Sequence, residues 1–133
     1  MKKLAVVAIS TIISLTTFAQ QPPTEAPLNL AGIMKSMSST LKKIAAQVSD
    51  PTKNSESEKL SDELVAMTKN SKDHFPKKAS DADKQQQYLK MIDDTVVLSQ
   101  ELAAAFHNND NAKAVDVLNK LSAAKKEGHT TFK

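Results

Sequence analysis

The sequence AKAVDVLNKLSAAKKEGHTTF, residues 112–132, has the pattern of a long amphipathic helix. Val115, Leu118, Ser122, Lys125 and His129 recur along it at spacings of three and four. Leu118 and His129 are eleven residues apart, close to three turns at 3.6 residues per turn. This spacing predicts that His129 lies on the same face as Leu118 and points into a core. A histidine so placed near the end of a helix is either a buried structural residue or a ligand.

Three earlier segments have the same kind of helical period. Asn29 is expected to cap a first helix, which Ser49-Asp50-Pro51 should end because proline disfavours the helical region for the residue before it. Its apolar positions follow an alternating 4, 3 spacing typical of a helix that packs in a bundle. These positions are Leu30, Met34, Met37, Leu41, Ile44 and Val48.

The second and third helices have their own start signals. Ser55 and Glu58 fit a capping box for the second, which Phe75-Pro76 should end. Ser80, Asp81 and Asp83 open the third, with acids at its positive end. The predicted core positions are Leu60, Leu64, Met67, Ser71 and His74 in the second helix, and Tyr88, Ile92, Thr95, Ser99, Leu102 and Phe106 in the third, widened by Met91, Val96 and Leu98.

A turn at residues 107–110, His-Asn-Asn-Asp, separates the third helix from the fourth. No strand pattern competes with these four helical periods. Four helices with short connections predict an all-α fold, an antiparallel up-down-up-down four-helix bundle.

The first 28 residues have a different character. A basic start at residues 1–3, an apolar run from Leu4 to Leu15 and the small residues around Ala19 predict a secretory signal peptide over residues 1–19. A retained amphipathic anchor is the alternative interpretation. Residues 20–28 contain three prolines and are expected to form an extended linker, which leaves residues 29–133 as the bundle domain. The protein is thus expected in the periplasm, with no membrane span after cleavage.

Composition narrows the possible functions. Removal of residues 1–19 leaves 16 lysines against 15 acids, a net charge of +1 that gives no reason to expect a nucleic-acid partner. The chain has no arginine, the side chain that usually binds phosphate through two hydrogen bonds. It also has no cysteine and so cannot form a disulfide. Aromatic residues are few, and the core must therefore consist mainly of Leu, Ile, Val, Met and Ala.

Met34 and His129 are expected to meet. In an up-down-up-down bundle the start of the first helix and the end of the last lie at the same end. Met34 is about one turn inside the former and His129 about one turn inside the latter. A thioether and an imidazole facing each other form a known axial pair for haem iron. From spacing alone a methionine at position 34 is more typical of core packing, and a histidine at position 129 of a core or surface residue, than of a ligand pair.

Two segments resemble the soluble cytochrome b562 family. Residues 34–44, MKSMSSTLKKI, are similar to its first-helix block, with Leu-Lys seven positions after the methionine and Ile at ten. Residues 112–129, with Ala114, Leu121 and His129 in place, align without a gap to its last helix. Residues 72–77, KDHFPK, resemble its second turn, whereas the chain between Glu56 and Phe106 matches only in pattern.

The resemblance implies one haem b, bound without covalent links, with Met34 and His129 as its axial ligands. The family's basic residue one turn before the histidine is arginine, and here it is Lys125, which would meet a haem propionate as a point charge. The aromatic residue that precedes the histidine in the family is Gly128 here. This glycine either lets a flat macrocycle approach or belongs to a fraying terminus.

Met37, Tyr88, Phe75 and two further histidines are also candidates for the same site. Met37 lies one turn deeper than Met34 and is expected to line the haem pocket, which Tyr88 and Phe75 would flank. His74 lies at the His129 end and is an alternative ligand to Met34, or else a solvated residue near a helix terminus. His107 lies a helix length away at the opposite end and is expected to be exposed.

Two functional hypotheses follow from these residues. The first is a periplasmic electron-transfer protein with one haem b, a redox partner protein not yet identified, and a monomeric state. The second is a haem-free helical bundle that serves as an interaction or chaperone-like module. Enzyme activity is not expected, because the chain offers no Ser-His-acid arrangement, no phosphate loop and no Glu-x-x-His set.

Overall fold

The computed structural model describes residues 29–132, and that part of the chain is all-helical. The predicted signal peptide, residues 1–19, and linker, residues 20–28, lie outside the described residues. The four long helices are α1 (Leu30–Gln47), α2 (Asn54–Asn70), α3 (Ala82–His107) and α4 (Asn111–Phe132). Two short 3₁₀ turns, η2 (Pro51–Lys53) and η3 (Ser71–Asp73), flank α2.

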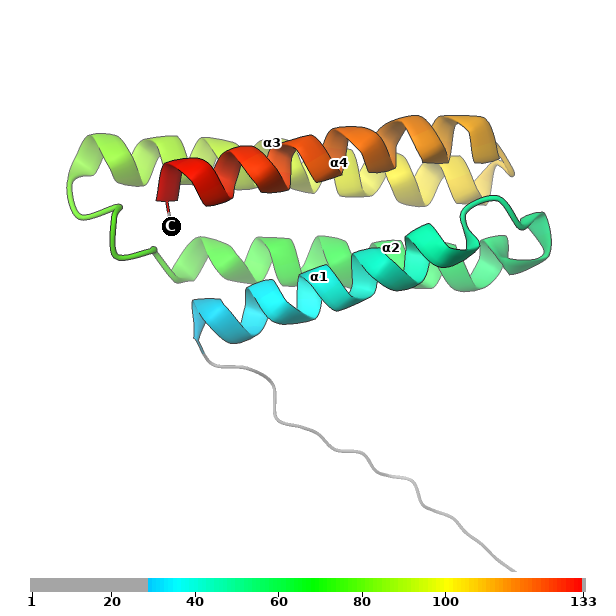
Figure 1. Ribbon diagram of the computed structural model, residues 1–133, viewed down its shortest axis with the longest axis horizontal. Helices are drawn as coiled ribbons and strands as arrows, with labels where there is room; N and C mark the ends of the chain where they lie inside the picture. The colour runs from blue at the N-terminus through cyan, green and yellow to red at the C-terminus, as the bar shows by residue number, and fades with distance from the viewer. Residues whose placement is uncertain (1–28, 133) are drawn as a thin grey trace, which may run out of the picture.

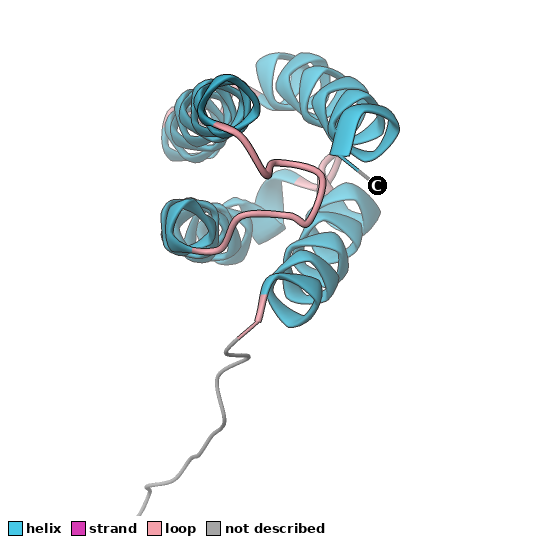
Figure 2. Cartoon of the chain, turned by 90° about the vertical axis from the view of Figure 1, so that its left-hand side faces the viewer, coloured by secondary structure: helices cyan, strands magenta, loops and turns pink. Residues whose placement is uncertain are grey.

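The helices form an antiparallel up-down-up-down bundle, as the sequence predicts (Figure 1). Each helix packs on the next, and α2 and α3 make the most extensive contact. The contact between α1 and α4, the first and last helices, is far smaller. Figure 2 views the bundle along its length, with α1 and α4 on one side of it. This weak contact positions the site described below.

Three of the helix starts are capped by the residue types that the sequence indicates. Asn29 accepts a hydrogen bond from the Gly32 amide, and Asp81 accepts one from the Lys84 amide. Asp110 accepts from the Lys113 amide, which satisfies one of the free amides at the start of α4. The tight turn before it contains Asn109 at a φ of 55°, a left-handed conformation that asparagine tolerates.

The predicted capping box at the start of the second helix is wrong. Helix α2 begins at Asn54, so Ser55 is already inside it, and η2 precedes it. The cap lies further upstream, because Asp50 accepts hydrogen bonds from the amide and hydroxyl of Thr52. A Pro-Thr-Lys turn after an aspartate therefore initiates the segment, and the helix continues from it.

The buried face of α2 also differs from the prediction. Leu64 is fully buried as expected, but Leu60, Met67 and His74 are only half-buried. Small hydroxyl residues take the centre of the face, and three of them, Ser61, Thr68 and Ser71, donate to the backbone of their own helix segment. Their small size lets α2 and α3 approach closely. The fully buried hydroxyl residues of α2 and η3 are Ser57, Ser61, Thr68 and Ser71.

The core is divided along the bundle axis. The larger cluster includes Ile44, Leu64, Leu102, Phe106 and Val117 and joins all four helices. The smaller one contains Tyr88, Ile92, Val96 and Ala79, and it lies toward the end at which α3 begins. Both consist mainly of aliphatic side chains, as the composition predicts.

Asparagines fasten the end of the bundle where α3 turns into α4. Asn54, only 4% exposed, donates to the side chains of Asn109 and Asn111 at 3.0 and 3.1 Å. Asn111 in turn donates to the Val48 carbonyl at 2.7 Å. These bonds connect the end of α1, the start of α2 and the α3–α4 turn. Between residues 29 and 132, no helix is long and apolar enough to cross a membrane.

Candidate functional site

A cavity of about 990 Å³ lies between α1 and α4, with α3 and the loop after η3 completing its wall. We call it the α1–α4 cavity. It lies between two helices that make far less contact with one another than the consecutive helices do. Its volume is at the upper end of the range for small-molecule sites. The wall is mostly apolar and consists of Asn29, Leu30, Ala31, Met34, Lys35, Met37, Ser38, Leu41, Leu64, Phe75, Pro76, Lys77, Lys78, Tyr88, Met91, Ile92, Thr95, Leu121, Ala124, Lys125, Gly128, His129 and Phe132.

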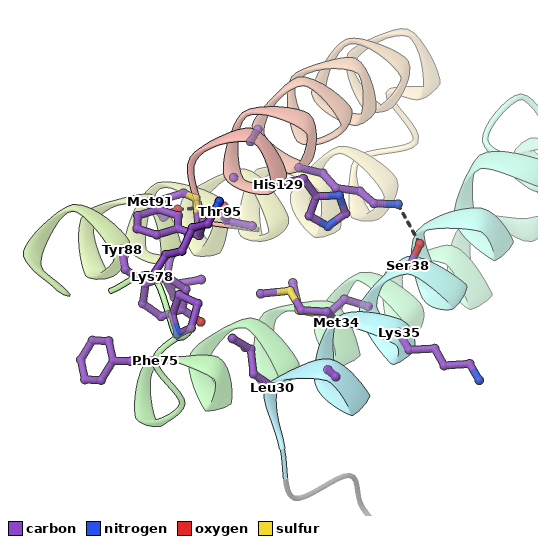
Figure 3. Close-up of a pocket in the computed structure, with 18 of the residues that line it drawn as sticks. Leu30, Met34, Lys35, Ser38, Phe75, Lys78, Tyr88, Met91, Thr95 and His129 are labelled. Carbon is purple, nitrogen blue, oxygen red and sulfur yellow. Dashed lines mark hydrogen bonds between the residues drawn. The ribbon is translucent and has the colours of Figure 1, made fainter. Parts of the chain in front are cut away.

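Met34 and His129 both line the α1–α4 cavity, on its two opposite helices. Figure 3 shows the Met34 thioether rising from α1 and the His129 ring descending from α4, so that the two side chains point toward one another. Met34 is half-buried and packs against the larger core cluster. The thioether and the imidazole are the two donors that the sequence predicts to meet.

The prediction that His129 points into the core is wrong. His129 is exposed, as are Val115, Ser122 and Lys125 of the same predicted face. The buried face of α4 is displaced by about one residue around the helix and consists of Ala114, Val117, Leu118, Leu121 and Gly128. Leu118 belongs to both the predicted and the observed buried face, so the sequence pattern is compatible with either. His129 therefore lies at the border between the cavity and the solvent.

Gly128 does not belong to a fraying terminus, and it lines the α1–α4 cavity. It is buried within α4, and a Cβ atom added there would lie 2.8 Å from the Met91 sulfur and 3.3 Å from its methyl carbon. The glycine thus makes room for the Met91 side chain of α3. Met91, a third thioether of the cavity wall beside Met34 and Met37, was placed by the sequence on the face of α3 but not in the site.

Lys125 connects α4 to α1 across the cavity. Its ammonium group donates to the Ser38 hydroxyl at 2.7 Å, the dashed line at Ser38 in Figure 3. This is the direct side-chain hydrogen bond between these two helices among the described residues. Lys35, Lys77 and Lys78 also line the cavity, although the sequence pattern did not indicate them as site residues. Lys77 and Lys78 follow Phe75-Pro76 in the loop at the His129 end, a position that could have signalled them.

Aromatic rings form one end of the cavity wall. The ring centroids of Phe75 and Phe132 lie 5.7 and 5.6 Å from that of Tyr88. Tyr88 is 1% exposed and donates its hydroxyl to the Ser71 carbonyl at 2.9 Å, whereas Phe75 is 41% exposed. Burial raises the pKa of the Tyr88 hydroxyl above its usual 10.0, and the nearby Ser71 side chain lowers it by a smaller amount. The predicted flanking residues therefore do line the cavity.

The two other histidines do not belong to the cavity wall. His74 is half-buried in the loop after η3 but does not line the cavity. His107 lies at the opposite end of α3, exposed as predicted, with its Nδ1 atom 3.1 Å from a carboxylate oxygen of Glu58. The geometry thus favours Met34 over His74 as the partner of His129.

All six residues predicted for the site, namely Met34, Met37, Phe75, Tyr88, Lys125 and His129, line this one cavity. Within residues 29–132, no three His, Cys, Asp or Glu side chains gather closely enough to hold a metal ion. The cavity offers one thioether and one imidazole on opposite walls, with apolar surface between them and lysines beside it. These residues fit a metal ion that is already bound within a large apolar ring. Haem b has this character, with a flat apolar ring and two carboxylates.

Comparison with known proteins adds no relative: no family model, no curated protein and no solved structure matches this chain. Its site is therefore interpreted from its own residues.

Proposed function

We propose that this protein transfers electrons by means of one non-covalent haem b in the α1–α4 cavity. The observation that carries the proposal is that Met34 and His129 line one apolar cavity from opposite helices and point toward one another (Figure 3). Bound haem would supply a one-electron redox couple at its iron. Met34 and His129 would hold the iron from the two facing helices.

The surrounding residues would hold and tune the group. A thioether ligand favours reduced iron and raises the reduction potential. Met37, Ile92 and Leu121 would exclude water from the ring, and Tyr88 with Phe75 would bound one side of it. Lys125 would pair with a propionate, as a point charge rather than a fork. The exposed position of His129 would leave an edge of the haem accessible to a redox partner.

The cellular setting belongs to the same proposal. The N-terminal sequence supports export to the periplasm, and the partner would be another redox protein there. The protein would act as a monomer and, as a carrier, would catalyse no reaction of its own.

The proposal is tested by reconstituting the protein with haem and recording its optical spectrum in the reduced state. We expect sharp low-spin bands, which Met34→Ala and His129→Ala should each remove while opening the iron to carbon monoxide. Met67→Ala and His107→Ala are the matched controls. Met67 is a half-buried methionine and His107 an exposed histidine, and neither lines the cavity, so both variants should keep the bands.

Two results would contradict the proposal. Unchanged spectra in both ligand variants would show that the iron is bound elsewhere. A folded protein that stays colourless with excess haem would favour the alternative, a haem-free interaction or chaperone-like module.

A further inference from the structure

The charged residues of the α1–α4 cavity all have the same sign. Its wall contains four lysines, Lys35, Lys77, Lys78 and Lys125, and not one aspartate or glutamate. The chain as a whole carries nearly as many acids as lysines, so this is a local segregation of charge. A cavity of this kind is complementary to a molecule with a large apolar part and an anionic end.

The lysines are available to an anion. Within the part of the chain that the structure describes, none of the four forms an ion pair with a carboxylate. Lys125 has only the Ser38 hydroxyl as its partner. A carboxylate is the stronger acceptor for an ammonium group, because both members of the hydrogen bond are then charged. An incoming carboxylate would therefore take the place of Ser38. Lys35 points away from the cavity in Figure 3, and Lys78 and the Lys125–Ser38 bond lie on opposite sides of it. A carboxylate could therefore meet either Lys125 or the neighbouring Lys77 and Lys78.

The apolar wall suits a flexible chain. Three thioether side chains, Met34, Met37 and Met91, line it, and methionine adapts its shape to irregular ligands because it is unbranched and has three rotatable bonds. Leu64 and Leu121, both at most 2% exposed, lie deeper in the wall. An alkyl chain could thus extend from the lysines to the buried leucines over continuous apolar surface, and its burial would provide most of the binding free energy.

We propose that the α1–α4 cavity binds a long-chain fatty acid, with its carboxylate at Lys125 or at the Lys77–Lys78 pair and its alkyl chain along the three methionines. This binding requires no iron and no axial ligand. It therefore goes beyond the proposed electron-transfer function and does not rest on it. Because both ligands would fill the same cavity, a fatty acid would compete with haem.

The test measures binding of cis-parinaric acid to the full-length, haem-free protein, using the rise in probe fluorescence in an apolar environment. The alcohol with the same alkyl group is the uncharged comparison, and its affinity is measured from its displacement of the acid. Each exposed ion pair contributes a factor of up to about five, so we expect the acid to bind about tenfold more tightly than the alcohol. The same advantage should be lost in the triple variant Lys77→Gln, Lys78→Gln, Lys125→Gln.

The control variant carries Lys42→Gln, Lys43→Gln and Lys113→Gln, three exposed lysines outside the cavity wall, and has the same net charge as the test variant. It should bind the acid as the unmodified protein does. Circular dichroism of both variants would verify that they are folded. The proposal is overturned if the acid does not bind, if acid and alcohol bind equally, or if the two triple variants lose affinity equally. Since no haem is present, these outcomes are independent of whether the electron-transfer proposal holds.

Discussion

Tyr88 is the single tyrosine of the chain, and it connects three parts of the cavity end. Its ring lies between Phe75 of the loop and Phe132 at the end of α4, and its hydroxyl reaches the Ser71 carbonyl at the end of α2. A buried hydroxyl resists ionisation, because a charge is poorly solvated there. The pKa of this residue is therefore a direct measure of how well this end of the bundle is closed.

We expect the tyrosinate absorbance of the folded protein to appear only above the usual pKa of 10.0, because burial raises the pKa of Tyr88. A pKa that is higher in the folded than in the unfolded state gives a stabilisation that is fully present below pH 10 and is lost as the pH rises through the folded pKa. The free energy of unfolding should then decrease with pH more steeply in the unmodified protein than in Tyr88→Phe. Urea unfolding from pH 8 upward measures this difference.

Two results would contradict this expectation. One is an absorbance transition at the ordinary pKa of a solvated tyrosine. The other is a stability difference between the unmodified protein and Tyr88→Phe that stays constant with pH. At neutral pH the variant should be less stable by about 1 kcal/mol, since it loses one hydrogen bond of a buried group.

At the scale of the helices, the contact between α3 and α4 at the cavity depends on a missing side chain. Gly128 lies within α4, where glycine is less favourable than alanine by about 0.5–1 kcal/mol. The structure tolerates this because Met91 of α3 occupies the space that a Cβ would take. The methionine end is flexible, so the conflict with an added methyl group is moderate.

Gly128→Ala should therefore change stability little in the unmodified protein, because the gain in helix propensity and the conflict with Met91 oppose each other. In a Met91→Ala background the conflict is absent, and the same substitution should stabilise the protein by about 0.5–1 kcal/mol. Urea unfolding of the unmodified protein, the two single variants and the double variant gives the coupling free energy between positions 91 and 128. An equal effect of Gly128→Ala in both backgrounds would show that the contact has no energetic role.

At the scale of the whole molecule, the bundle is closed at one end and open at the other. Asparagine side chains join α1, α2 and the α3–α4 turn at the closed end. At the cavity end, α1 and α4 are joined by the bond between Lys125 and Ser38. The asparagine bonds thus fix one end of the bundle, while the α1–α4 cavity occupies the other.

We expect Asn54→Ala to destabilise the protein by about 1–3 kcal/mol, because Asn54 is 4% exposed and its loss removes two hydrogen bonds to the half-buried amide of Asn111 and one to Asn109. Asn119→Ala is the matched control. Asn119 is exposed in the middle of α4, and alanine there should be neutral or slightly stabilising. Thermal or urea unfolding of both variants measures the contrast, and equal stabilities would show that the asparagine cluster does not fasten this end.

The local sequence was sufficient for the four helices and most of their starts, because caps such as Asn29, Asp81 and Asp110 act on amides within three residues. It also sufficed to bring Met34 and His129 to one end, since short connections between helices force antiparallel neighbours. The capping box at Ser55 failed because Asp50 initiates the segment earlier through a 3₁₀ turn.

The side of α4 that is buried could not be read from the sequence, because its candidate faces share Leu118 and both mix apolar residues with small or polar ones. Packing against α3 selected the face with Gly128, since that is where the Met91 side chain fits. The same packing left His129 at the cavity border instead of in the core. Whether a cavity exists between the first and last helices depends on how closely they approach, and that distance is a property of the assembled bundle that no single helix encodes.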